Sequence, residues 1–218
     1  MAISAVVFDM DGVLVDSEPV WEQVRRAYVA AKGGRWLPDT QHRLMGMSTG
    51  EWAAYLSGDL RVGESPEQVA RDVIAKMAEH YDRAVPVLPG AVAAVQRMHE
   101  RWPLGIASSS PRALIDVVLE RLGLTGYFSV TRSTEEGHRG KPAPDVYLTV
   151  AQSLHQRPDY CAAVEDSSNG VRSAHAAGMR VIAAPRPEYP LAADAAALPA
   201  ATITGLDELT YTHVAGEQ

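Results

Sequence analysis

The sequence predicts an α/β fold in which a parallel sheet carries helices on both of its faces. Short apolar runs alternate with longer segments of helical period through residues 86–218, and this alternation is typical of parallel sheets. The alternation is interrupted once, because residues 17–85 contain helical patterns and no convincing strand. A chain of 218 residues can form one such core with a small insertion. We therefore expect a core domain over 1–16 and 86–218 and a helical domain over 17–85.

The first strand is predicted at Ala5–Phe8, an apolar run that ends beside an acidic residue. Within the insertion, apolar residues at helical spacing predict three helices: from Glu18 to the glycines at 33 and 34, over 49–56, and over 66–81. The proline-rich segment 85–90 then predicts a rigid return to the core. The chain thus leaves its core after one strand and comes back some seventy residues later.

Beyond this segment, helices and strands are expected in turn. The helices are predicted over 90–101, 110–122, from 144 onward, and over 168–177. The strands are predicted over 104–107, 128–131, 160–164, 180–184 and 201–204. Ser110 is expected to cap the second of these helices, with Pro111 in its first turn, because both residue types favour those positions. Together with the first strand, these elements predict a flavodoxin- or Rossmann-like sheet.

Composition argues against several classes of protein. The net charge of −7 comes without a dense basic stripe, which argues against nucleic-acid binding. Apolar runs fall far short of a membrane span, and the first is too short for a signal peptide. The single cysteine, Cys161, falls in a predicted strand and can form no disulfide within the chain. We therefore expect a cytoplasmic protein with Cys161 as a small buried side chain.

Polar side chains follow three predicted strands at their carboxyl ends, where open α/β sheets bind ligands. They are Asp9 and Asp11, Ser108-Ser109-Ser110, and Glu165-Asp166, with Lys141 in a loop before the helix from 144. Clustered carboxylates require a cation, and hard oxygen donors without a His–Cys set favour Mg²⁺. A lysine beside hydroxyls and helix amides suits a phosphate. The sequence therefore predicts a phosphate held next to Mg²⁺ and a carboxylate nucleophile.

Each of these features alone has a simpler interpretation. Asp-x-Asp-Gly is a common turn, serines before a helix usually cap it, and Glu165-Asp166 suit an acidic helix entry. Lys141 is the most informative single residue, because the chain has only three lysines against seventeen arginines. A lysine kept between Gly140 and Pro142 indicates that a compact ammonium is required there. Four signals in this order favour one shared site.

Four segments resemble the motifs of the haloacid dehalogenase-like hydrolase superfamily. They read DMDGVLVDSE at 9–18, ASSS at 107–110, GKPAPD at 140–145 and VEDS at 164–167. The subgroup resembled contains the β-phosphoglucomutases and the sugar-phosphate phosphatases with a helical cap after the first strand. The similarity covers nearly the whole chain and is weakest over 17–85. It implies that this segment is the cap, which selects the substrate.

The resemblance implies a role for each polar residue. Asp9 would attack phosphorus and form an aspartyl-phosphate, and Asp11 would protonate the leaving oxygen and then activate the hydrolytic water. Ser108, Ser109 and Lys141 would bind the phosphoryl oxygens. A dehalogenase of this fold would need neither Asp11 nor a metal. The family member expected is therefore a phosphatase acting on a small phosphorylated metabolite, with a sugar phosphate as the first candidate.

The resemblance also implies a cofactor. Asp9, Asp11 and Asp166 would hold Mg²⁺, Asp11 through its backbone carbonyl, with Glu165 as a further or outer ligand. The partners expected are a small-molecule phosphorylated substrate and neither nucleic acid nor membrane. The chain itself is expected to be a monomer or a weak dimer.

Three departures from the motifs favour a phosphatase over a β-phosphoglucomutase. Trp21 stands where those mutases have a histidine. Residues 46–49 read Gly-Met-Ser-Thr where an arginine would follow Gly-x-Ser, and Pro111-Arg112 replace a Lys-Asn pair. A mutase remains the first alternative. A phospho-receiver domain, or a catalytically silent binding relative, is more remote, because a receiver carries its phosphorylated aspartate on a later strand.

Some residues of the insertion have two interpretations. An apolar wall against the leaving group, or simply the interior of the cap, is expected from Trp21, Met45, Met47 and Trp52. Arg43 and Lys76 are candidate cations, although solvated helix faces explain both. His138 and His175 have no metal-ligand spacing and are expected to be surface or packing residues.

Overall fold

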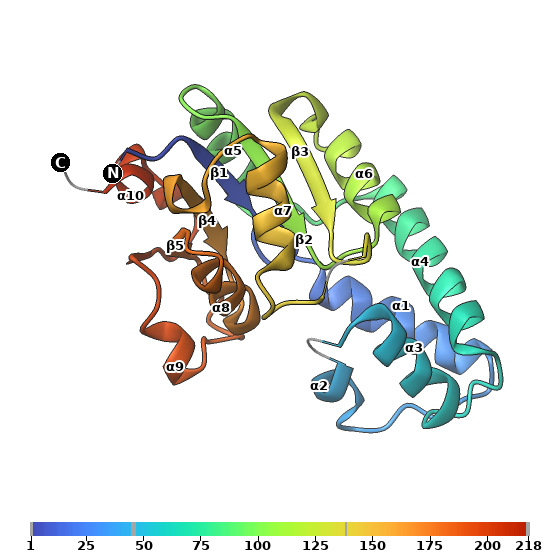
Figure 1. Cartoon of the computed structure of the whole chain (residues 1–218). Coiled ribbons are helices and arrows are strands. Elements are labelled where there is room, and N and C mark those ends of the chain that lie inside the picture. Colours follow the sequence, from blue (N-terminus) through green and yellow to red (C-terminus); the bar gives the residue numbers. More distant parts are fainter. Residues whose placement is uncertain (1, 45–46, 138, 217–218) are drawn as a thin grey trace. The chain divides into compact units, whose positions relative to one another are not determined.

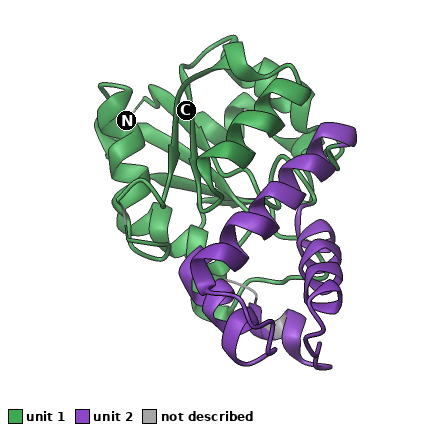
Figure 2. Cartoon of the chain, turned by 90° about the vertical axis from the view of Figure 1, so that its right-hand side faces the viewer, with its two compact units in different colours: residues 1–16, 85–218 green, residues 17–84 purple. Residues whose placement is uncertain are grey.

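The computed structural model describes residues 2–44, 47–137 and 139–216. Met45, Gly46 and His138, all named above, lie outside the described residues. The chain divides into two compact units, shown in Figure 2: residues 1–16 with 85–218, called here the core unit, and residues 17–84, called the helical unit. The helical unit begins at the predicted residue, 17, and ends at 84, one residue before the predicted end.

The core unit is built on a parallel sheet, as predicted. Its six described strands lie in the order β3-β2-β1-β4-β5-β6. They are β1 Ala5–Phe8, β2 Leu104–Ser108, β3 Phe128–Ser133, β4 Cys161–Glu165, β5 Arg180–Ala183 and β6 Ala201–Thr202. β1 pairs with β2 on one side and with β4 on the other. The strand order therefore reverses at β1, the point where open α/β sheets place their ligands.

Helices cover both faces of this sheet. They are α5 Ala91–His99, α6 Arg112–Arg121, α7 Asp145–Ser153, α8 Ser168–Ala176, α9 Ala193–Ala196 and α10 Tyr211–Ala215, with 3-10 turns at Thr125–Tyr127, Pro158–Tyr160 and Leu206–Glu208. α7 and α8 lie on the near face in Figure 1, where Val146 and Val171 pack against Val7 and Ala163. α5 and α6 lie toward the other face, as right-handed crossovers require.

The helical unit contains four described helices and no described strand. They are α1 Glu18–Ala31, α2 Thr40–Leu44, α3 Thr49–Gly58 and α4 Pro66–Arg83. α4 packs against both α1 and α3, and its buried face carries Val69, Val73 and Met77. The Tyr28 hydroxyl on α1 donates to Asp72 on α4 at 2.9 Å. The all-helical insertion predicted from the sequence is present, with α2 as an additional short helix.

Most element bounds differ from the sequence prediction by one or two residues, and one assignment is wrong. Ser110 does not cap α6, which begins at Arg112 with Pro111 in the N-cap position and no side-chain cap. The Ser110 hydroxyl donates to Asp11, which lies in the loop after β1. Cys161 is buried in β4 as expected. Within the described part of the chain, none of the helices has the length and apolarity that crossing a bilayer requires.

Candidate active site

Three neighbouring strands bring Asp9, Ser108 and Glu165 to one edge of the core sheet. Phe8 is paired with the strands on both of its sides, so the residue after it lies just beyond the ladder. There the Asp9 backbone N–H donates to the Val164 carbonyl at 3.0 Å. Ser108 and Glu165 are the last residues of β2 and β4. Three of the predicted site residues therefore meet because parallel strands end at a common edge.

Two glycines allow the surrounding loops to approach the acids closely. Gly12 has a φ of +76°, and a Cβ placed there would lie 1.9 Å from the Asp166 carboxylate. A Cβ on Gly170 would likewise lie 1.9 Å from Glu165. Any side chain at either position would displace an acid of the site. Gly12 is thus required both by its left-handed backbone and by its contact with Asp166.

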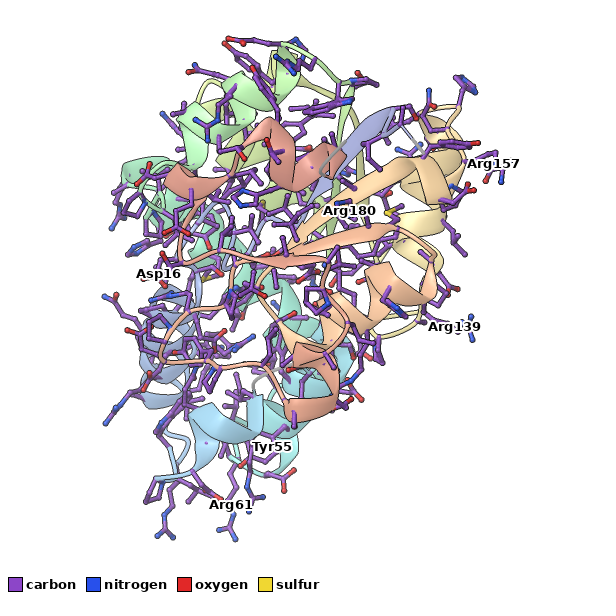
Figure 3. The ribbon with its side chains drawn as sticks, turned by 90° about the vertical axis from the view of Figure 1, so that its left-hand side faces the viewer. Asp16, Tyr55, Arg61, Arg139, Arg157 and Arg180 are labelled. Carbon is purple, nitrogen blue, oxygen red and sulfur yellow. The ribbon has the colours of Figure 1, made fainter. Side chains whose placement is uncertain are left out.

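The Lys141 ammonium is buried against three oxygen atoms. Its Nζ lies 3.0 Å from Asp9 Oδ1 and 2.7 Å from Glu165 Oε1, and it donates to the Ala107 carbonyl at 3.0 Å. Its side chain is 6% exposed. Burial would lower the pKa of Lys141, but the two carboxylates outweigh it and raise that pKa above its usual value. Arg139, two residues earlier, instead projects from the surface (Figure 3) and pairs there with Asp145.

Glu165 is a fully buried anion whose two oxygens are both engaged. Oε1 accepts from Lys141 and from the Tyr147 hydroxyl, each at 2.7 Å. Oε2 accepts from the backbone N–H of Asp166 at 3.1 Å and from the Ser167 hydroxyl at 3.2 Å. Burial, and then the charge of Glu165, raise the pKa of Tyr147, so its hydroxyl remains a neutral donor. This network fixes the carboxylate that in turn holds Lys141.

Three carboxylates form a group able to hold a divalent cation. One oxygen each from Asp9, Glu165 and Asp166 lies within 4.8 Å of the others. Burial raises the pKa of both Asp9 and Asp166, and the nearby Glu165 charge raises them further, while Lys141 opposes the shift. One ammonium does not balance three acids, so the group fits an added cation. Because all donors are hard oxygens, the group suits Mg²⁺.

The Asp11 side chain has hydrogen-bond partners of its own in the serine run. Its Oδ2 accepts from Ser110 Oγ at 2.8 Å and from Ser108 Oγ at 3.3 Å. Its Oδ1 is buried without a hydrogen-bond partner among the described residues. Ser108 is fully buried and also accepts from the Ser110 backbone N–H at 2.9 Å. Ser109, predicted beside them, is exposed. The two predicted catalytic acids thus have different surroundings within one site.

Two residues contact the predicted site in ways that the sequence patterns do not predict. Ser110 is in the serine run, but the Ser-Pro pair points to helix capping instead. Tyr147 stands on the buried face of α7, where an aromatic residue predicts packing alone. A polar atom on a buried helix face is the available signal, because such a hydroxyl usually needs a partner.

Trp21 and Trp52 pack in the interior of the helical unit. The Trp21 and Trp52 rings lie 5.9 Å apart, and both residues are buried. The Arg25 guanidinium lies 4.5 Å from the Trp21 ring centroid and 5.0 Å from the Trp52 ring centroid. These contacts favour the simpler interpretation, the interior of the unit. Arg43 pairs at the surface with Asp39, and Lys76 is exposed, as solvated helix faces predict.

Comparison with known proteins gives consistent results. A family model described as haloacid dehalogenase-like hydrolase matches residues 3–178. Hexitol phosphatase B of Escherichia coli K12 is 37% identical over a 192-residue alignment, and the match covers 85% of each chain. A phosphorylated carbohydrates phosphatase of Thermotoga maritima is 32% identical, covering 83% of this chain and 84% of its own. The crystal structure of β-phosphoglucomutase from Clostridium difficile superposes with a TM-score of 0.79 at 20% identity, over 97% and 95% of the two chains, which shows a shared fold.

Proposed function

The chain belongs to the haloacid dehalogenase-like hydrolases, as its four motifs predict, and from this premise we propose that it is a Mg²⁺-dependent phosphatase. It would hydrolyse a small phosphorylated metabolite through an aspartyl-phosphate. The predicted reaction class agrees with the two sequence relatives, which are both named phosphatases. The observation that supports the proposal most is the position of Asp9, a buried carboxylate 3.0 Å from the Lys141 ammonium and grouped with Asp166.

The first step forms a bond from an Asp9 carboxylate oxygen to phosphorus and breaks the bond from phosphorus to the leaving oxygen. Asp11 supplies the proton that the leaving alkoxide needs. Lys141 offsets negative charge on Asp9 and on the phosphoryl oxygens, and Ser108 and Ser109 are further donors to those oxygens. Strong charge stabilisation is required, because phosphate monoesters need up to about 10²¹-fold acceleration. Acid–base catalysis supplies only about 10²- to 10⁴-fold of this.

The second step returns the enzyme to its starting state. Asp11, now ionised, takes a proton from water as the water oxygen attacks phosphorus, and the bond to Asp9 breaks. Inorganic phosphate leaves, and Asp11 carries the proton for the next cycle. Asp9, Asp166 and the Asp11 backbone carbonyl would hold Mg²⁺, with Glu165 nearby. The cation supplies positive charge beside the transferred phosphoryl group. Both Glu165 oxygens already accept hydrogen bonds. We therefore propose that Glu165 holds Lys141 in place rather than binding Mg²⁺ directly.

A sugar or sugar-alcohol phosphate is the substrate class we propose. Two relatives are named for hexitols and for phosphorylated carbohydrates. The mutase alternative is less favoured, because Arg112 already has partners within the chain. Arg112 is one of the two residues that replace the Lys-Asn pair of the mutases. It donates to the Thr131 carbonyl at 2.7 Å and also pairs with Glu136. A residue held in this way is not free to bind a second phosphate.

The test is phosphate release with Mg²⁺ across a panel of hexitol phosphates, sugar phosphates and other phosphometabolites. We expect activity that chelation of divalent cations abolishes. Asp9→Asn keeps the shape of the side chain but removes the nucleophilic charge, and should lower kcat at least about 10³-fold, since loss of a nucleophile can cost about 10⁶-fold.

Two results would contradict the proposal. Phosphate release by Asp9→Asn at the rate of the parent would exclude Asp9 as nucleophile. Conversion of β-glucose 1-phosphate to the 6-phosphate without phosphate release would identify a mutase.

A further inference from the structure

Ser110 is buried and held in place from three directions. Its exposed fraction is 6%. Its backbone N–H donates to Ser108 Oγ at 2.9 Å, and its carbonyl accepts from the fully buried Ser133 hydroxyl at 2.6 Å. The remaining polar group, the Ser110 hydroxyl, donates to Asp11 Oδ2 at 2.8 Å. Both backbone contacts therefore serve to fix where this hydroxyl lies.

Helix capping does not account for the Ser110 hydroxyl. α6 begins at Arg112, and its N-cap residue is Pro111, whose carbonyl accepts from the N–H groups of the first turn. Serine is a preferred N-cap residue, but Ser110 lies one residue before the N-cap. Its acceptor lies on a loop ninety-nine residues away in the sequence. The contact is therefore one of tertiary structure at the acid of the predicted site.

We infer that Ser110 is a positioning residue that orients the Asp11 carboxyl group for both of its proton transfers. This inference rests on the proposed function, in which Asp11 first gives and then takes a proton. With Oδ2 bound to Ser110, the oxygen left to exchange that proton is Oδ1, which is buried and has no partner among the residues that the structure describes. The hydroxyl fixes which of the two oxygens reacts.

A hydroxyl is suited to this task because Oδ2 can stay its acceptor in both forms of Asp11. The Ser110 hydroxyl donates to Oδ2 when the carboxyl group is ionised, and it can keep donating to the same oxygen when Oδ1 carries the proton. Ser110 can therefore hold Asp11 in one orientation throughout the cycle. Ser108 makes a longer contact of 3.3 Å to the same oxygen and is shared with the phosphate site, so it is a weaker anchor.

The test compares two leaving groups in the first turnover. An alkyl phosphate, such as a hexitol phosphate, releases an alkoxide that needs the Asp11 proton. p-Nitrophenyl phosphate releases a stable phenolate that leaves without one. Ser110→Ala should slow the first turnover of the alkyl phosphate by about 10-fold or more, a share of the 10²- to 10⁴-fold that a positioned acid supplies. Because nitrophenolate needs no proton from Asp11, the rate of its first burst should change less than about 3-fold.

Two further variants keep the test decisive. Ser110→Cys leaves no cavity, because the thiol is larger than the hydroxyl, but it donates only weakly, so it should show the same dependence on leaving group. Ser4→Ala removes a hydroxyl that bonds Gln156 and the Tyr160 carbonyl, in the same unit but before β1. It is the matched control and should leave both rates unchanged.

Different results would overturn the positioning role of Ser110 and the proposed phosphatase function. Equal slowing of both substrates by Ser110→Ala and Ser110→Cys, or no slowing of either, would overturn the positioning role and leave the phosphatase intact. Absence of phosphate release from both substrates by the parent protein would overturn the phosphatase itself.

Discussion

The two units of this protein each bury a cation, and they stabilise it in different ways. In the core unit, Lys141 lies within 3.0 Å of three oxygens from Asp9, Glu165 and Ala107. In the helical unit, Arg25 lies over the faces of Trp21 and Trp52, and its Nε is buried with no hydrogen-bond partner in the described part of the chain. The pKa of Lys141 is raised by its carboxylates, whereas burial lowers the pKa of Arg25 to about 10 and Glu18 opposes only part of this.

The difference follows from the architecture of each unit. Parallel strands end at one edge, so the core unit can gather carboxylates, hydroxyls and a lysine there without a helix between them. Helices that pack through apolar side chains offer a buried cation mainly ring faces, which attract it through their quadrupole. A cation held by carboxylates can respond to a new anion such as phosphate. A cation held by rings contributes chiefly to packing.

The largest effect is expected at Lys141. Lys141→Met leaves Asp9 and Glu165 buried without their counter-ion, and removing one partner of a buried pair costs about 3–5 kcal/mol. Loss of a preorganised donor to developing charge lowers kcat by about 10²- to 10³-fold or more. The measurements are urea unfolding and phosphate release on the same preparation.

Arg139→Met is the matched control, because Arg139 is an exposed cation in the same loop. Its removal should change stability by no more than about 0.5 kcal/mol. Comparable losses from both variants would mean that burial and carboxylate partners do not distinguish Lys141.

The site of the core unit can be predicted from the sequence, although some of its details cannot. The apolar runs place the strands, and the acids, serines and lysine at their ends predict the site. The predicted strands 104–107 and 160–164 stop one residue early, before Ser108 and Glu165. Both residues are in fact paired in the sheet, with Ser133 and Ala183, while their side chains reach the site. A polar residue at a strand end satisfies its backbone in the ladder and its side chain outside it.

The remaining features depend on distances that no local pattern contains. Ser110 follows the rules for a helix cap, and only the approach of Asp11 from the loop after β1 gives its hydroxyl a tertiary partner. Arg25 sits on a helix where charged residues are usually solvated, yet it is buried between two tryptophans. One of them, Trp52, comes from α3, so the burial of Arg25 depends on how α1 and α3 meet.

A smaller effect is expected at Tyr147, which brings both kinds of contact to Lys141. The Lys141 Nζ lies 5.1 Å from the Tyr147 ring centroid, and the hydroxyl donates to the Glu165 oxygen that accepts from Lys141. Tyr147→Phe keeps the ring and removes the hydroxyl. Losing a hydrogen bond to a charged group costs about 1.5–3 kcal/mol, and kcat should fall less than for Lys141→Met. Urea unfolding and steady-state kinetics measure both. A stability unchanged within error would show that the ring, not the oxygen network, fixes this part of the core.

The smallest effect is expected at Arg25, and it tests the ring-held cation directly. Arg25→Met removes a cation–π contact worth about 0.5–2 kcal/mol. It also removes the cost of burying a charge. Replacing a buried charge by an apolar side chain is often neutral or stabilising by about 1–4 kcal/mol. Because these two contributions oppose each other, we expect the free energy of unfolding to change by no more than about 1 kcal/mol. Urea unfolding monitored by tryptophan fluorescence measures this change. Arg25→Ala is the control for volume and should cost about 2 kcal/mol or more through the cavity it leaves. A loss above about 3 kcal/mol for Arg25→Met would place Arg25 with Lys141, as a cation whose buried partner is left uncompensated.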